Sequence, residues 1–152
     1  MGVKTGNRIS QCMIVKNEER NIERALLWGK TVMWEQIVVD TGSADRTVEL
    51  ARKMGAKVFF LEWPEDFAAA KNYAIDRAEG DWIVFLDADE YMTEKDTKKL
   101  PDVFDRLSHK GYDGITALLH NLDDAGQVFS SCSHLRFFRN TPDIRYKRRI
   151  HE

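Results

Sequence analysis

The sequence predicts an α/β fold, with a mostly parallel sheet that carries helices on both faces. Apolar runs alternate with helix-like segments over the first part of the chain, and each connection is long enough to cross over the sheet. The later part has a hairpin pattern, so a small antiparallel part is expected after the parallel strands. With 152 residues the chain has the size of one domain, and we expect a single domain over residues 1–152.

Four apolar runs mark the expected parallel strands, and helical segments separate them. Asn17 can cap a first helix that runs to about Trp28. A turn at Thr41–Asp45 leads into a second helix, and a third, alanine-rich helix is expected over Phe67–Ala78. The strands are expected at Ile9–Val15, Glu35–Asp40, Lys57–Trp63 and Trp82–Leu86.

The later part of the chain predicts one polar helix and two paired strands. The helix is expected around Lys95–Ser108, and the strands at Asp113–His120 and Val128–Arg139. The Asp123–Gly126 segment between them is typical of a hairpin turn. In an open α/β sheet, ligands bind at the carboxyl ends of the parallel strands, so function is expected there.

Composition and charge exclude several classes of protein. The net charge of −2 gives no general attraction to nucleic acid or to an anionic membrane. No stretch approaches the ~20 apolar residues of a membrane span. Cys12 and Cys132 form neither a disulfide framework nor a zinc site, which favours a reducing compartment. The expected location is the cytoplasm, or the inner face of the membrane.

Three carboxylates follow the fourth apolar run, at Asp87, Asp89 and Glu90. In extended chain Asp87 and Asp89 project to the same side. Two carboxylates about 4 Å apart repel by about 1 kcal/mol in water and about 4 kcal/mol at a protein-like dielectric, so a cation or a shared proton is expected between them. All-oxygen ligation indicates Mg²⁺ or Mn²⁺.

The ends of the other strands are also polar, with Asn17 and Glu18 after the first and Asp40 after the second. A lone acidic residue after a strand is usually a helix cap, which is our interpretation of Asp45 and Asp66. Asp40 precedes a Thr-Gly-Ser turn, where its carboxylate can accept the N–H of a base or a ribose hydroxyl. For Asp40 the capping and the binding interpretations stay equally open.

Any phosphate group must be bound without a glycine-rich loop, because no Gly-x-Gly-x-x-Gly or Gly-Lys-Ser/Thr pattern occurs. Its charge must be met by a metal and by cations. Lys71 lies early in the third helix, near its positive dipole end, and is the candidate, although a surface lysine is the alternative. A basic tail can serve a phosphate-bearing ligand or form a solvated rim. It comprises Arg136, Arg139, Arg145, Lys147, Arg148 and Arg149.

Four of these segments together resemble glycosyltransferase family 2, the nucleotide-sugar-dependent enzymes with the GT-A fold. Cys12–Glu19 is similar to the family's opening strand and Asn-Glu turn, and Val38–Thr47 to its Asp-x-x-Ser-x-Asp-x-Thr element. Phe67–Asn72 resembles the Ala-Ala-Arg-Asn helix start, and Leu86–Asp89 the Asp-x-Asp strand end. The resemblance runs continuously over 9–91, which it implies is the nucleotide-sugar-binding half.

The resemblance implies a nucleotide diphosphate-sugar donor, most simply a UDP-sugar, and Mn²⁺ or Mg²⁺ as cofactor. It implies that Asp40 hydrogen-bonds the base, that Lys71 lies near the diphosphate, and that Asp89 holds the metal. Asp87 would face the ribose or sugar, beside the metal. Ile14, Lys16 and Glu18 would border the base. Ile14 stands where the family more often has proline, and Lys71 where it more often has arginine, so a bidentate phosphate contact is lost.

Residues 92–152 would form the acceptor side, and the closing His-Glu resembles a subgroup that includes bacterial surface-polysaccharide and peptide transferases. Most members invert the anomeric carbon by direct displacement, which requires a base for the acceptor proton. Glu152 is the expected base, with His151 as the alternative base or metal ligand. The acceptor is a saccharide, a lipid-linked group or a peptide. Apolar surface near Phe137, Phe138 and Tyr146 would mark an acceptor groove or a dimer contact.

Three other interpretations of the sequence remain. The chain can be a truncated nucleotide-sugar-binding module that needs more chain or a partner for activity and has no turnover on its own. Measured donor hydrolysis or transfer would decide between this module and the enzyme. A metal-dependent nucleotidyltransferase would need a glycine-rich loop after the first strand, where Lys16–Glu19 offers none. A phospho-acceptor receiver domain also uses aspartates at strand ends, but it would require a different strand assignment.

Overall fold

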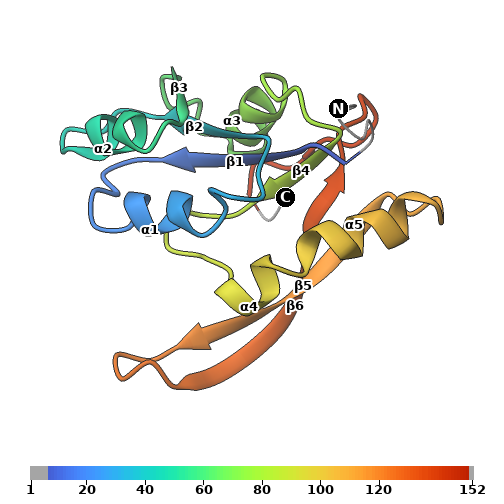
Figure 1. Cartoon of the computed structure of the whole chain (residues 1–152). Coiled ribbons are helices and arrows are strands. Elements are labelled where there is room, and N and C mark those ends of the chain that lie inside the picture. The colour runs from blue at the N-terminus through green and yellow to red at the C-terminus, as the bar shows by residue number, and fades with distance from the viewer. Residues whose placement is uncertain (1–6, 151–152) are drawn as a thin grey trace.

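The computed structural model describes residues 7–150 and contains one six-stranded mixed sheet (Figure 1). The strand order is β3-β2-β1-β4-β6-β5. The first four strands are parallel, whereas β6 runs antiparallel to β4 and β5 antiparallel to β6, which confirms the expected fold class. The strands are β1 (Ile9–Val15), β2 (Glu35–Asp40), β3 (Lys57–Phe60), β4 (Trp82–Phe85), β5 (Gly114–Leu122) and β6 (Val128–Arg139).

Helices cover both faces of the sheet. The helices are α1 (Ile22–Leu27), α2 (Thr47–Lys53), α3 (Phe67–Ile75), α4 (Glu94–Thr97) and α5 (Leu100–Ser108). Buried side chains of α1, α2 and α5 pack on one face, and those of α3 on the other, where the segment 144–146 joins them. Of the parallel strands, β1, β2 and β4 are therefore buried on both sides, which accounts for the apolar runs within them, whereas the edge strand β3 is partly exposed.

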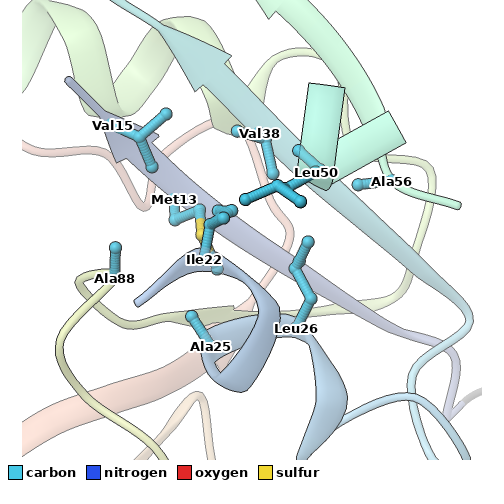
Figure 2. Close-up of a cluster of buried hydrophobic side chains, with 10 residues drawn as sticks. Met13, Val15, Ile22, Ala25, Leu26, Val38, Leu50, Ala56 and Ala88 are labelled. Atoms are coloured by element: carbon cyan, nitrogen blue, oxygen red, sulfur yellow. The ribbon is translucent and has the colours of Figure 1, made fainter. Parts of the chain in front are cut away.

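One part of the core joins α1 and α2 to the middle of the sheet. Figure 2 shows Met13 of β1 and Val38 of β2 in one cluster with Leu26 of α1 and Leu50 of α2. Ala88, which follows β4, belongs to the same cluster and is only 3% exposed. The turn that carries the acidic residues is therefore anchored to the core by the alanine between them.

The later strand β6 completes the core on both faces. Phe137 packs with Trp82 on the α5 side, and Phe138 packs with Phe85 on the α3 side, because successive residues of a strand face opposite ways. Phe137 and Phe138 are 3% and 4% exposed. The expectation of apolar surface at these two residues is wrong, because pairing with β4 places them inside the sheet. Tyr146 is half-buried against the same core.

Long-range contacts set the start of the first helix. Asn17 does not cap it, and α1 begins only at Ile22. Asn17 has a positive φ of 55°, a conformation that asparagine tolerates better than most residues. Its side-chain oxygen accepts a hydrogen bond from the N–H of Ala44 at 2.8 Å, and its own N–H donates to Ser43 Oγ at 2.8 Å. The cap expected at Asn17 is instead a link between two loops.

Two other boundaries differ from those expected. The polar helix is split into α4 and α5, with Pro101 in the first turn of α5. Proline lacks an N–H, and its ring clashes with the carbonyl four residues earlier, so one helix cannot continue through this point. The third strand ends at Phe60 and not at Trp63, and Asp66 caps the following helix through the N–H of Ala69 as expected.

The β5–β6 hairpin extends away from the body of the sheet (Figure 1). Asp123 holds its turn by accepting hydrogen bonds from the N–H groups of Ala125 and Gln127, and Gly126 takes the positive φ of 77°. None of the helices within residues 7–150 combines the length and apolar character that a bilayer crossing requires.

Two buried glutamines satisfy the end of α1. Gln36 donates to Gln11 Oε1 at 2.7 Å and to the carbonyl of Leu26 at 2.6 Å. Gln11 in turn donates to the carbonyl of Ala25 at 2.7 Å. Both side chains are buried, so these carbonyls have an internal partner where water has little access.

Gln36→Met is expected to lower the free energy of unfolding by about 1–3 kcal/mol, because it leaves the Leu26 carbonyl and Gln11 Oε1 buried without this donor. Chemical denaturation followed by circular dichroism measures the change. Gln127→Met, at an exposed position of the hairpin turn, is the matched control. Equal unfolding midpoints for the two variants would contradict a stabilising role for the buried pair.

Candidate active site

A cleft of about 480 Å³ lies at the carboxyl ends of the parallel strands. It collects side chains from the ends of β1 and β4 and from α3, as expected for an open α/β sheet. Six of the residues singled out from the sequence line it together. They are Ile14, Lys16, Glu18, Lys71, Asp87 and Asp89.

The acidic segment after β4 is a turn. The N–H of Glu90 donates to the carbonyl of Asp87 at 3.0 Å, and β4 itself ends at Phe85. The expected extended geometry for Asp87 and Asp89 is therefore wrong. The buried Ala88 fixes the middle of the turn, so both aspartates are exposed and line the same cleft by a different route.

Glu90 supports this turn from the side of β6. One carboxylate oxygen accepts a hydrogen bond from the N–H of Asp87 at 3.0 Å, and the other pairs with Arg136 Nη2 at 2.6 Å. The two side chains are 13% and 15% exposed. Burial raises the pKa of Glu90, although the Asp87 N–H and Arg136 oppose that shift. Nε of Arg136 is buried without a hydrogen-bond partner among the described residues.

Asp40 holds the turn that follows β2. Its Oδ2 accepts hydrogen bonds from the N–H groups of Gly42 and Ser43 at 3.1 and 3.0 Å. Its Oδ1 is buried and has no partner within residues 7–150. Asp40 is 3% exposed and does not line the cleft, whereas its neighbour Thr41 does. Oδ2 of Asp40 thus stabilises the turn, while Oδ1 accepts no hydrogen bond from residues 7–150.

Loops after β1 and β2 are joined by hydrogen bonds that fix the Lys16–Glu18 rim. The N–H of Glu18 donates to Thr47 Oγ1 at 2.8 Å, and the N–H of Glu19 donates to Asp45 Oδ2 at 3.1 Å. Hydrogen bonds to Thr47 and Glu19 hold the pKa of Asp45 below its usual range against desolvation. Asp45 therefore organises the loops, in keeping with its interpretation as a structural residue.

Lys71 lies on α3 with its ammonium group between two aromatic rings. Nζ is 5.4 Å from the ring centroid of Phe85 and 4.7 Å from that of Tyr146. The residue is 9% exposed, and it is not the solvated surface lysine of the alternative interpretation. Ring faces attract a cation at such distances, so the charge is held at a defined place on the cleft wall.

The tail of the chain is attached to α3. Asn72 Nδ2 donates to the carbonyl of Tyr146 at 2.8 Å, and the N–H of Tyr146 donates back to Asn72 Oδ1 at 2.9 Å. The N–H of Phe67 donates to the carbonyl of Arg149 at 3.0 Å. Residues 146–149 therefore lie along the helix that carries Lys71.

Several cleft residues were not predicted. Thr41 lines the cleft after β2, and Ala88 lies between the two aspartates. Trp63 and Phe67 form an edge-to-face pair, with ring centroids 4.9 Å apart, that lines another part of the wall. The signal in the sequence that could have indicated this wall was the presence of two aromatic residues, Trp63 and Phe67, at or just before the start of α3. Glu152 and His151, the expected base and its alternative, lie outside the described residues.

The carboxylates that line the cleft suit a divalent ion that a bound ligand also coordinates. Within residues 7–150, no three His, Cys, Asp or Glu side chains are grouped closely enough to bind a metal by themselves. Asp87 and Asp89 are two exposed carboxylates on one cleft. Mg²⁺-type ions are commonly bound by one or two carboxylates together with substrate phosphates, which is the chemistry this pair can provide.

Known proteins match almost the whole of the described chain. The model for glycosyl transferase family 2 matches residues 10–149. A TPR repeat-containing protein of Synechococcus elongatus is 42% identical over 146 residues, which is 95% of this chain and 35% of the relative. The chain therefore spans about a third of that relative's length.

Two solved structures have the same fold. Staphylococcus aureus TarS 1–349 in complex with UDP superposes with a TM-score of 0.57 at 25% identity, over 81% of this chain and 38% of that chain. Glucosyl-3-phosphoglycerate synthase from Mycobacterium tuberculosis in complex with Mn²⁺, UDP and glucosyl-3-phosphoglycerate gives 0.51 at 26% identity, over 58% of this chain and 37% of that chain. The family match and this shared fold agree with the cleft described above, and the chain belongs to glycosyl transferase family 2.

Proposed function

We propose that the chain binds a UDP-sugar in the cleft and that the sugar passes from it to an acceptor with inversion. The observation that carries this proposal is the assembly of Lys16, Glu18, Lys71, Asp87 and Asp89 around one cleft at the carboxyl ends of the strands. TarS and the mycobacterial synthase were both solved with UDP, which favours uridine as the base.

Recognition of the base belongs to the β1 and β2 side of the cleft. Ile14, Lys16 and Glu18 border the uracil, and Asp40 Oδ1 accepts the N3–H of that ring. The support for Asp40 is its buried Oδ1, which has no hydrogen-bond partner among residues 7–150 and belongs to the residue before Thr41 of the cleft. A small movement of the Thr41–Ser43 turn is needed for the base to reach it.

Charge on the diphosphate is met from the opposite side of the cleft. Lys71 binds a phosphate oxygen, while Asp87 faces the ribose or sugar and Asp89, with Asp87 beside it, holds Mn²⁺ or Mg²⁺. When bound, the ion supplies Lewis-acid stabilisation of the leaving diphosphate. The mycobacterial synthase contains Mn²⁺ together with UDP, which supports a divalent ion for this chain.

The transfer step requires a base opposite the diphosphate. The acceptor oxygen attacks the anomeric carbon, the bond from that carbon to the diphosphate oxygen breaks, and the acceptor proton passes to a carboxylate. We assign the base to Glu152, with His151 as the alternative.

Calorimetric titration of UDP into the purified chain, with and without Mn²⁺, tests the donor site. Binding that strengthens with Mn²⁺ is the expected result. Release of UDP from UDP-sugars, measured separately, tests turnover. Failure of UDP to bind in either condition would leave the chain with the family's fold and no donor site of its own.

A donor-binding module without turnover is the second candidate. The observation in its favour is that the chain spans about a third of the Synechococcus relative's length. UDP binding with no sugar release from any nucleotide sugar would favour this candidate over the enzyme.

Asp40→Asn is expected to weaken UDP binding about tenfold or more, because a hydrogen bond to a charged group contributes about 1.5–3 kcal/mol. The amide oxygen can still accept from Gly42 and Ser43, so the turn is kept. CDP is the matched control ligand, since cytosine lacks an N–H at that ring position. A loss of equal size for UDP and CDP would contradict base recognition by Asp40.

A further inference from the structure

The cleft in which we place the UDP-sugar is called the donor cleft. A second cleft, of about 490 Å³, adjoins it, and Lys71 lines both. It lies between β6 and the segment 144–148, and no acidic residue is found among the residues between 7 and 150 that line it. Apart from Tyr146, its polar lining is basic. The residues that provide it are Lys71, His134, Arg136, Arg145, Lys147 and Arg148.

Two of these cations are held in place by carboxylates outside the cleft. Arg136 pairs with Glu90 at 2.6 Å, and Arg145 Nε pairs with Asp76 Oδ1 at 3.1 Å. Nη1 of Arg145 also donates to the carbonyls of Thr141 and Ile144. These contacts fix both guanidinium groups while leaving further N–H donors, so the two arginines are oriented before any ligand arrives.

Two further cations of the cleft, Lys147 and Arg148, are exposed. Lys147 and Arg148 form no ion pair with any residue between 7 and 150. The Asn72–Tyr146 hydrogen bonds place this segment against α3, so the chain keeps these charges together at the cleft although like charges repel. A concave surface of one sign concentrates the potential and attracts a ligand of the opposite sign.

We propose that the second cleft binds a phosphate group of the acceptor. This inference rests on the proposed function, because it assigns the acceptor side of the same transfer. Arginine N–H groups suit phosphate oxygens in number and geometry. Leu135, Phe138 and Ile144 give the cleft an apolar wall, which can hold the uncharged part of the acceptor. Because Lys71 borders both clefts, an acceptor anchored here lies next to the sugar of a bound donor.

The anion could instead be the donor's own diphosphate, and occupancy of the donor cleft separates the two cases. Glycerol 3-phosphate is the probe, with glycerol as its uncharged control, titrated into isotope-labelled protein saturated with UDP and Mg²⁺. Amide shifts at residues 134–136 and 144–148 are expected with glycerol 3-phosphate and not with glycerol. The affinity is expected to fall as salt is raised.

The double variant Lys147→Gln/Arg148→Gln is expected to weaken the binding of glycerol 3-phosphate about tenfold or more without changing UDP affinity. Both residues are exposed, so the fold is kept. Arg52→Gln/Lys53→Gln removes a matched exposed pair from α2, away from both clefts, and should leave probe binding unchanged.

Each other outcome overturns the inference in a distinguishable way. Probe binding that UDP abolishes would assign the cations to the donor diphosphate. UDP binding with no probe binding would remove the acceptor site and leave the donor site intact. Probe binding without any UDP binding would leave an anion site but remove its assignment to an acceptor. Binding to vesicles of phosphatidylcholine with phosphatidic acid, without binding of glycerol 3-phosphate, would identify a membrane contact instead.

Discussion

Asp89→Asn is expected to abolish the strengthening of UDP binding by Mn²⁺ and to lower the rate of sugar transfer about 100- to 1,000-fold. Lewis-acid stabilisation of a leaving phosphate contributes several kcal/mol, and each 1.36 kcal/mol is tenfold in rate. Asp89 is exposed on the donor cleft, and the turn that carries it is anchored by Ala88. The substitution therefore removes the charge of the proposed metal ligand and keeps the support of the turn.

The control for Asp89→Asn is Asp124→Asn, which makes the same charge change at an exposed position of the hairpin turn. Calorimetry of UDP at several Mn²⁺ concentrations gives the binding effect, and release of UDP from the donor gives the rate. If Asp89→Asn retains the full Mn²⁺ effect on UDP affinity, the ion is not held at this turn.

Arg136→Met is expected to lower the free energy of unfolding by about 3–5 kcal/mol at neutral pH, because it leaves a mostly buried Glu90 carboxylate without its partner. UDP affinity should fall as well, since Glu90 holds the N–H of Asp87 in the donor turn. Arg106→Met, on an exposed part of α5, is the matched control.

The loss of stability in Arg136→Met should shrink as the pH is lowered toward about 5. Burial already raises the pKa of Glu90 above its ordinary value, and removal of Arg136 raises it further. A carboxyl group whose pKa is higher in the folded state binds more protons there, so its stabilising contribution is present at low pH and is lost as the pH rises through the folded pKa. Chemical denaturation of the unsubstituted chain and of Arg136→Met at about pH 5 and pH 7.5 measures the difference in free energy of unfolding at each pH.

Glu90→Gln removes the charge together with one of the two acceptor atoms. The single amide oxygen can accept from the Asp87 N–H or from Arg136, whereas the two carboxylate oxygens of Glu90 accept from both. This variant has no carboxyl group to protonate, so it should lose stability with no rescue at low pH. A destabilisation of Arg136→Met that is equal at both pH values would show that the ion pair is not its cause.

Local sequence patterns were enough to predict most of the strands and several of the residues that line the cleft at their carboxyl ends. The bounds of β1, β2 and β6 agree with those expected, because long apolar or alternating runs and flanking turn residues define them. The six cleft residues followed from one rule, that the carboxyl ends of parallel strands meet at one edge. Asp66 was identified as a cap because its bond to Ala69 spans only three residues.

Contacts between distant segments account for what could not be predicted. Asn17 bonds to Ser43 and Ala44, which no local pattern shows. The Glu90–Arg136 pair depends on the register of β6 against β4, and the end of the basic tail is placed by contacts with α3, such as the hydrogen bonds between Asn72 and Tyr146. The charges of these segments were visible in the sequence, but the surfaces they share were not.

The position of β6 beside β4 also has a consequence for biosynthesis. The chain emerges from the ribosome with β1 to β4 first, yet β6, the second partner of β4 beside β1, comes last. Until Phe137 and Phe138 arrive, the nascent sheet presents an open edge and uncovered aromatic surface at Trp82 and Phe85. Such edges promote aggregation of incomplete chains. Fragments that end before β6 should therefore depend on chaperones, and exchange of the donor half between relatives should require the matching β6 strand to travel with it.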